Sequence, residues 1–373
     1  MSTDGNALAG SLAATLQATE IAKLLDAAVS EHSIAGSEVL FDPLHQVHYR
    51  SRLERNPKCR FSHERYFPQK TSNLTLREAF ALTTPGPNEQ KSLSVPDGRF
   101  VSRLICAACD HEEKLWKLRD SLDVFSLACP KCATPRTIRG FDLTDRLLGA
   151  GLTPEDLGRS LADLGLRGGE VFHIEGPHAE QHFMLADSNA GDIAPGGIAV
   201  VVAGQGNIGS FLAPHLARLR GVSRVVLCDP DIYEPGQQVN QDIPADAVGR
   251  AKAEVQAERL RAIQPGLDVV AFVAPVESLP LGMLEGAIVV SCLDSRAARQ
   301  HLASRAWRIG SPFVDAAVGG GSSLLVRTNV YIPSPDAACF ECAFDDRDYE
   351  QLEQIFPCNE NEAQSSGARP RKD

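Results

Sequence analysis

The chain lacks any long hydrophobic run. None of its apolar segments reaches the roughly 18 consecutive residues that a membrane-spanning helix needs. The N-terminal sequence MSTDGNALAG also lacks the basic and then apolar pattern of a secretion signal. We therefore expect a cytoplasmic protein that does not work at a membrane.

Positive charge is scarce relative to negative charge. The 37 Lys and Arg residues face 48 Asp and Glu residues, which leaves a net charge of −11. Because an acidic protein repels a phosphate backbone, nucleic acid is not expected as its main partner. Internal repeats are not evident either, and the 373 residues leave room for two domains or for one large domain with an insert.

One stretch, residues 196–229, has the pattern of a nucleotide-binding unit. An apolar run over 198–203 predicts a buried strand, and apolar periodicity over 210–219 predicts a helix. Between them, G-x-G-x-x-G is formed by Gly204, Gly206 and Gly209. Glycine lets the backbone approach a phosphate, and an acid after the next strand, here Asp229, can hold ribose hydroxyls. By itself the motif fits NAD-linked enzymes as well as ATP-dependent ones.

From residue 196 onward, predicted strands alternate with predicted helices. This order favours an α/β fold, a doubly wound Rossmann-like domain with a mostly parallel sheet. Elsewhere the spacing predicts a long helix over 7–28, one or two strands over 37–53, a helix over 144–166 and a hairpin over 169–185.

The ten cysteines include three C-x-x-C pairs. In a reducing compartment this pattern indicates metal binding rather than disulfides. Two of the pairs, separated by 19 residues, have the spacing of a zinc ribbon at about residues 100–140, within an α+β module. Its four thiolate ligands would be Cys106, Cys109, Cys129 and Cys132. Such a ribbon either stabilises a small domain or recruits a partner.

The part from about 195 to 345 resembles the ThiF/MoeB adenylyltransferases, the family that includes ubiquitin-activating enzymes. Several motifs carry the resemblance in the family's order. They are G-x-G-N-I-G-S at Gly204 to Ser210, Asp229-x-Asp231-x-x-Glu234, GRAKAE at Gly249 to Glu254, Cys292-Leu293-Asp294 with Arg299, and Cys339-x2-Cys342.

The resemblance implies a site for ATP and Mg²⁺ that activates a carboxylate. By resemblance Asp229 holds the ribose, Lys252 contacts the phosphates and Asp294 binds magnesium. The remaining ATP-binding residues that it implies are Gly204, Gly206, Gly209, Asp231, Gln237, Asn240 and Arg299. The sequence departs from the family at Asn240, where an arginine normally helps to screen the phosphates, and it has no arginine-rich segment ahead of the first strand.

The order of the chain also differs from that of the family. Segments that resemble the family's C-terminal part stand at the N-terminus, at residues 10–24, 38–43 and 56–59. We therefore predict a circular permutation, in which residues 1–66 are the displaced portion, 67–190 hold a linker and the ribbon module, and 191–373 are the nucleotide-binding portion with a crossover tail. This predicts one zinc site formed by Cys59, His63, Cys339 and Cys342.

Cys358 lies about where the family's crossover loop carries a cysteine. An accessible thiolate there could accept the activated carboxylate as a thioester. We expect ATP-dependent activation of a ubiquitin-like protein with a C-terminal glycine for transfer to a conjugating enzyme, by a protein that the resemblance makes a homodimer. The alternatives are adenylation of a sulfur-carrier protein, a non-catalytic scaffold that binds the carrier, and, more distantly, an NAD-linked dehydrogenase. No rhodanese-like region is recognisable, which favours the ubiquitin-like substrate.

Overall fold

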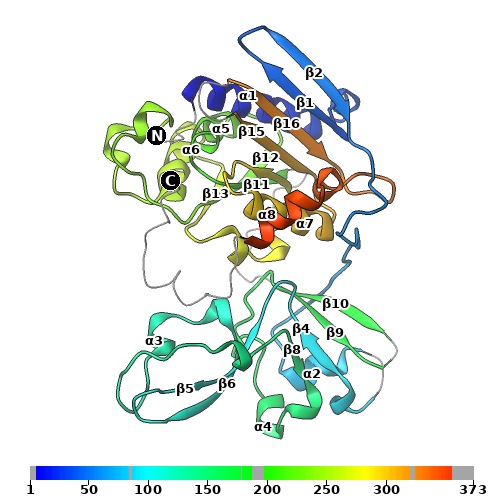
Figure 1. Cartoon of the computed structure of the whole chain (residues 1–373), viewed down its shortest axis with the longest axis vertical. Coiled ribbons are helices and arrows are strands. Elements are labelled where there is room, and N and C mark those ends of the chain that lie inside the picture. The colour runs from blue at the N-terminus through cyan, green and yellow to red at the C-terminus, as the bar shows by residue number, and fades with distance from the viewer. Residues whose placement is uncertain (1–5, 84–85, 178, 187–196, 320–323, 355–373) are drawn as a thin grey trace. The chain divides into compact units, whose positions relative to one another are not determined.

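The computed structural model describes residues 6–83, 86–177, 179–186, 197–319 and 324–354. These residues divide into two compact units (Figure 1). The first unit draws on Met1–Tyr66, Gly191–Leu279 and Met283–Glu353, and the second mainly on Phe67–Ala190. The first unit therefore combines segments from both ends of the chain.

The first unit is built on an eight-stranded sheet. Its strands, in spatial order, are β13 (Asp268–Phe272), β12 (Val222–Cys228), β11 (Ile198–Ala203), β14 (Ile288–Ser291), β15 (Phe313–Val318), β16 (Val326–Tyr331), β1 (Ser37–Asp42) and β2 (Val47–Arg52). The strands from β13 to β15 are parallel, and those from β15 to β2 pair antiparallel. Strands buried on both faces read as continuous apolar runs, as IAVVVA in β11 does.

Helices cover both faces of this sheet, which confirms the predicted doubly wound Rossmann-like fold. They are α1 (Ala7–Leu25), α5 (Gly209–Leu216), α6 (Lys252–Ile263) and α7 (Arg296–Ile309). The last described helix, α8 (Asp346–Gln354), contacts the start of α7 through an ion pair between Asp348 and Arg296. The helices α1, α5 and α6 share one hydrophobic cluster with Val314 and Ala316 of β15. Arg299 of α7 lies 3.7 Å from Asp315, which points to the opposite face, so α7 covers the other side.

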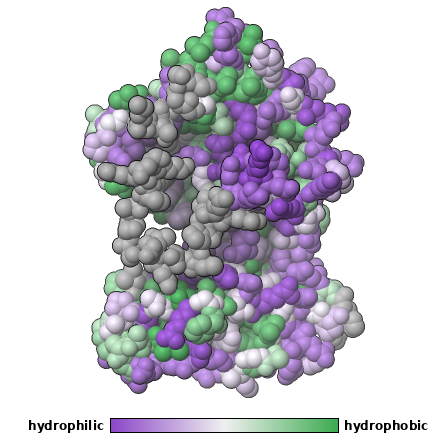
Figure 2. All heavy atoms as spheres, viewed as in Figure 1, coloured by the Kyte–Doolittle hydropathy of each residue, from purple (hydrophilic) through white to green (hydrophobic). Residues whose placement is uncertain are grey.

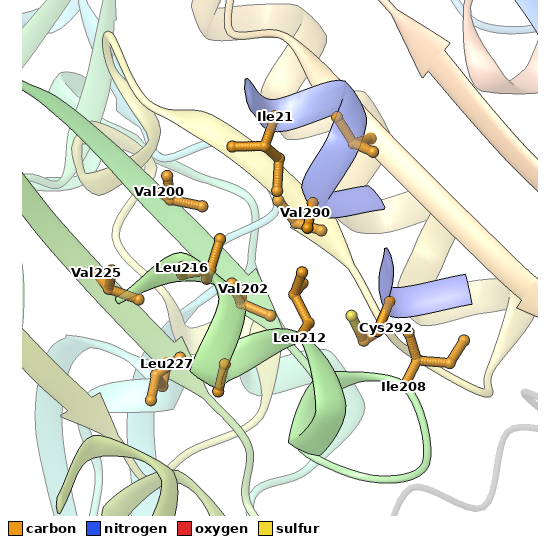
Figure 3. Packing of buried hydrophobic residues seen from close by; sticks show 14 of the residues in the cluster. Ile21, Val200, Val202, Ile208, Leu212, Leu216, Val225, Leu227, Val290 and Cys292 are labelled. Atoms are coloured by element: carbon orange, nitrogen blue, oxygen red, sulfur yellow. The ribbon is translucent and has the colours of Figure 1, made fainter. Parts of the chain in front are cut away.

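The helix α1 begins at Ala7, where the Asn6 side chain accepts a hydrogen bond from the Leu8 N–H at 2.8 Å. Its buried residues recur at helical spacing from Ala9 to Ile21. In Figure 3, Ile21 points into the same core as Leu212 of α5 and Val290 of β14. The N-terminal segment is thus part of the core of the first unit.

The second unit contains two small sheets. The first has the order β3 (Gln69–Thr71), β10 (Glu180–Leu185), β9 (Val171–Glu175), β4 (Ser92–Ser94) and β8 (Arg146–Leu148). The second has the order β6 (Glu112–Leu118), β5 (Phe100–Ile105) and β7 (Leu143–Thr144). Short helices accompany them, α2 (Leu76–Ala81), α3 (Val124–Leu127) and α4 (Pro154–Leu157). The hairpin predicted over 169–185 is present as β9 and β10, which pair antiparallel.

The helix predicted over 144–166 is wrong. This segment contains the last residue of β7, all of β8 and the four-residue helix α4. Leu147 enters the core of the second unit from β8, and Leu161 and Leu164 enter it from the turn after α4, so their spacing imitates a helical period. Gly149 and Pro154 are both unfavourable inside a helix, so they interrupt the predicted one. A Cβ at Gly149 would also overlap the carbonyl group of Asn88.

No helix among the described residues combines the length and the apolar character needed to cross a membrane. On the face shown in Figure 2, hydrophilic residues gather over α8, as its sequence DRDYEQLEQ requires.

A substitution at Gly10 tests how closely α1 packs against the glycine loop at Asn207. Helix propensity alone predicts that Gly10→Ala stabilises the protein by about 1 kcal/mol. A Cβ there, however, would lie only 2.6 Å from the backbone oxygen of Asn207, and such overpacking costs about 1–3 kcal/mol. We expect Gly10→Ala to lower the urea midpoint of unfolding. Gly266→Ala, where a Cβ meets nothing within 4 Å, is the control that leaves the midpoint unchanged; a higher midpoint for Gly10→Ala contradicts the packing.

Candidate functional site

The glycine loop follows β11 at the carboxyl edge of the sheet. The next strand in sequence, β12, lies on one side of β11 and β14 lies on the other, so the strand order reverses here, which is where open α/β sheets bind ligands. Gly204 has φ +92°, and a Cβ on it would lie 2.6 Å from the Cys292 carbonyl oxygen. At Gly206 a Cβ meets nothing within 4 Å, so there is open space next to the backbone of the loop. This geometry fits a phosphate group.

Asp229 and Lys252 lie together beside this loop. The buried Asp229 carboxylate accepts hydrogen bonds from the N–H groups of Gln205 at 2.6 Å and Asp231 at 2.9 Å. Burial raises the pKa of Asp229, while the charge of Lys252 acts in the opposite direction. The Lys252 ammonium lies 3.2 Å from the Asp231 carboxylate. Three predicted ATP-binding residues are thus brought together, with a cation among them.

A buried polar network holds the Asp229 loop in place. The hydroxyl of Tyr233, which is fully buried, donates to the Gln205 carbonyl at 2.8 Å. The Gln256 amide of α6 donates to the same hydroxyl at 2.8 Å. Sequence reasoning missed these residues; the position of Tyr233 two residues after Asp231 was the available signal. Their hydrogen bonds join the glycine loop, the Asp229 loop and α6.

Asp294 and Arg299 lie at the carboxyl end of the neighbouring strand. Asp294 is exposed and follows β14, directly before the Ser295 cap of α7. The Arg299 Nε donates to the Leu293 carbonyl at 2.6 Å, and its guanidinium lies 3.7 Å from Asp315. Burial raises the pKa of the wholly buried Asp315, and the charge of Arg299 lowers it. Arg299 therefore contacts the backbone that carries Asp294, and sequence reasoning missed Asp315.

Two of the predicted ATP-binding residues, Gln237 and Asn240, lie in the loop after Asp229. The Gln237 side chain accepts a hydrogen bond from the Glu234 N–H at 3.1 Å. The Asn240 side-chain oxygen is buried without a hydrogen-bond partner among the described residues. Arg259 of α6 binds the end of this loop through Asp242 at 2.6 Å. Cys358 lies outside the described residues.

The structure brings together Cys59, His63, Cys339 and Cys342. Their ligand atoms all lie within 4.8 Å of one another. The Cys339 sulfur lies 3.7 Å from those of Cys59 and Cys342, and the His63 Nε2 lies 3.3 Å from the Cys342 sulfur. A hydrogen bond with Cys339 lowers the pKa of the Cys342 thiol to about 4. The group joins a segment near the start of the chain to one near its end.

The second group is formed by the ribbon cysteines at the ends of two matching turns. The Cys106 and Cys129 N–H groups donate to the carbonyls of His111 and Thr134, each at 2.9 Å. Cys109 and Cys132 follow in each turn, with sulfur distances of 3.5–3.7 Å within the group. A hydrogen bond with the Thr134 hydroxyl lowers the pKa of Cys132 to about 6. The thiolate form of Cys132, which binds metal, is thus favoured.

Both groups fit a tetrahedral zinc ion. Zinc–sulfur bonds of about 2.3 Å place neighbouring sulfur atoms about 3.8 Å apart in a tetrahedron. The observed sulfur distances of 3.5–3.7 Å match this spacing and are far longer than a disulfide bond. Four thiolates, or three with an imidazole, are the donor sets of structural zinc.

Comparison with known proteins agrees with this geometry. Residues 197–363 match the ThiF family. The matched segment contains the glycine loop, Asp229, Lys252 and Asp294. The matched segment thus carries a ThiF family domain, which confirms its resemblance to the ThiF/MoeB adenylyltransferases.

Three proteins illustrate the similarity. The sulfur carrier protein ThiS adenylyltransferase of Escherichia coli is 28% identical over 151 residues, 39% of this chain and 58% of its own. The NEDD8-activating enzyme E1 catalytic subunit of Saccharomyces cerevisiae is 28% identical over 156 residues, 39% and 51% of the two chains. The tRNA threonylcarbamoyladenosine dehydratase of Escherichia coli is 32% identical over 128 residues, 33% and 47%.

A crystal structure of the last enzyme in complex with ATP matches with a TM-score of 0.31 at 31% identity, over 33% of this chain and 53% of that one. The chain spans about half the length of the curated relatives it matches.

The metal groups make a specific prediction. We expect two zinc ions per chain, one for each four-ligand group. Cys59→Ser and Cys339→Ser should each lose one ion, and the double variant should lose no more than that. Cys106→Ser should lose the other ion, and Cys228→Ala, outside both groups, should keep both. Elemental analysis of the purified chains measures this, and separate losses for Cys59 and Cys339 contradict a shared site.

Proposed function

We propose that this protein uses ATP to adenylate the C-terminal glycine carboxylate of a carrier protein. The observation that carries the proposal is the meeting of an open glycine loop with Asp229 and Lys252 at the carboxyl edge of a ThiF family domain. Two of the similar proteins are named for a sulfur carrier and for NEDD8, which supports a carrier protein as the substrate class.

The proposed roles follow from charge. The carboxylate oxygen attacks the α-phosphorus of ATP, a phosphorus–oxygen bond forms, and pyrophosphate leaves. Two anions must meet in this step, so cations have to screen both them and the leaving group. Lys252 supplies one cation, and Asp229 binds the ribose. Asp294 would hold Mg²⁺, which would supply a second cation. The buried network around Tyr233 keeps these loops in place before the substrates arrive.

We propose that Cys358 then takes the acyl group. Its thiolate attacks the carbonyl carbon of the acyl adenylate, a thioester forms, and AMP leaves. The preceding helix, α8, is fixed to the start of α7 by an ion pair between Asp348 and Arg296, two residues after Asp294. This step favours a ubiquitin-like carrier and a conjugating-enzyme partner over a sulfur carrier.

We also propose that the domain is circularly permuted. The matched family segment lies within residues 197–363, yet β1 pairs with β16, α1 enters the same core, and Cys59 joins Cys339. Residues 6–66 thus complete the sheet, the helical cover and a metal group that the matched segment begins. A circular permutation explains this arrangement because it keeps the contacts and changes only the chain connection.

A non-catalytic scaffold is the rival function. It is favoured by Asn240, which stands where the family has an arginine that screens the phosphates. Such a protein would bind the carrier without turning over ATP.

Exchange of labelled pyrophosphate into ATP separates the two functions. We expect exchange in the presence of a small protein with a C-terminal glycine that is encoded beside this chain. Asp294→Ala or Lys252→Ala should lower the rate by about 100-fold or more, because each removes charge screening from the transition state. Asp268→Ala, at the amino end of β13, is the control. Carrier binding without exchange supports the scaffold.

A thiol-sensitive adduct tests the role of Cys358. With ATP and the same carrier we expect an adduct that dithiothreitol cleaves, visible on non-reducing gels. Cys358→Ala should abolish it, and Cys358→Ser should give an ester that resists dithiothreitol. Cys228→Ala should keep the adduct because Cys228 is a buried strand residue. Exchange without any adduct would leave Cys358 with no acyl-carrying role and would favour the sulfur-carrier alternative.

A further inference from the structure

The side chain of Gln17 in α1 is wholly buried and faces the site from outside the matched family segment. Its Nε2 donates to the Ser291 carbonyl at 2.8 Å. Its Oε1 accepts a hydrogen bond from the Cys292 thiol at 3.3 Å. The nitrogen and the oxygen of one side-chain amide therefore form hydrogen bonds with two consecutive residues at the end of β14.

These two residues lead directly into Asp294. On the other side of the same short segment, the Arg299 Nε donates to the Leu293 carbonyl at 2.6 Å. The Cys292 N–H donates to the Ala203 carbonyl at 2.8 Å, which ties the segment to β11. Three consecutive residues before Asp294 thus have their backbone held by partners on three different elements.

A buried carbonyl that loses its donor is costly, so the Gln17 amide is a strong constraint on this segment. An apolar residue would fill the same space in the core between α1 and the sheet, as Ile21 does one turn later. A polar side chain at this position is therefore not needed for packing. What it supplies is a fixed position for the backbone of Ser291.

We propose that Gln17 is a positioning residue for Asp294. It fixes the end of β14 so that the Asp294 carboxylate leaves the sheet at the place where it can hold magnesium beside the glycine loop. This inference rests on the proposed function, because it assumes that Asp294 binds the metal. It also gives residues 7–25 a role in the site in addition to covering the sheet.

Binding of ATP at varied Mg²⁺ concentration, measured by calorimetry on the full chain, tests the proposal without a carrier protein. Gln17→Met removes the hydrogen bonds and keeps the side-chain volume. We expect it to raise the Mg²⁺ concentration for half-maximal ATP binding by about tenfold, the scale of one lost buried hydrogen bond. Ile21→Val is the matched control, since it perturbs the same face of α1 without touching Ser291, and should leave this concentration unchanged.

A double-mutant cycle separates positioning from general loosening. In an Asp294→Asn background, Gln17→Met should cause no further change in ATP binding. Two outcomes overturn this inference and leave the proposed function standing. In the first, ATP binding depends on Asp294 but is unchanged by Gln17→Met. In the second, Gln17→Met weakens ATP binding equally in the wild-type and Asp294→Asn backgrounds. ATP binding that Asp294→Asn leaves unchanged overturns the magnesium role and this inference together. If the Gln17→Met variant does not fold, Gln17→Leu takes its place in the same double-mutant cycle.

Discussion

The first unit depends on the cover that α1 gives to its sheet. Parallel strands have two apolar faces, and both must be removed from water. The helices that follow β11 and β12 cover only part of one face, while Val314, Val326 and Val330 pack with α1 in the same cluster. A helix that begins at Ala7 therefore completes a core whose parallel strands start near residue 198. The sheet also depends on the N-terminal segment, because β1 pairs antiparallel with β16.

The edge of the sheet is organised by buried polar groups that are hydrogen-bonded on both sides. Asp229 accepts two backbone N–H groups, Tyr233 links the glycine loop to α6, and Gln17 links α1 to β14. Such groups strengthen one another where water is excluded, and they hold loops that carry few apolar contacts. A site built in this way needs little rearrangement when a charged substrate arrives, which is the condition for electrostatic catalysis.

The two candidate metal-binding groups differ in how far apart their ligands lie in the sequence. One lies within the second unit, where two matching turns of the ribbon supply all four ligands. The other joins Cys59 to Cys339, 280 residues apart in the sequence, and Trp307 of α7 donates to the His63 carbonyl at 3.1 Å beside it. A metal that closes so long a loop restricts the unfolded chain and fixes the N-terminal segment against α7.

Local spacing determined much of this protein from its sequence. The glycine loop, the acid at Asp229 and the cysteine pairs lie in short motifs whose chemistry can be read without a fold, and the alternation of strands and helices predicted the sheet. The resemblance to a known family added Lys252. Only the tertiary structure identifies Gln17, Tyr233 and Asp315 as residues that support the site, because their partners lie on other elements. Gln17 and Ser291, for example, are separated by 274 residues. The same reason explains the wrong helix over 144–166, where apolar spacing is local but burial depends on neighbours far away in the chain.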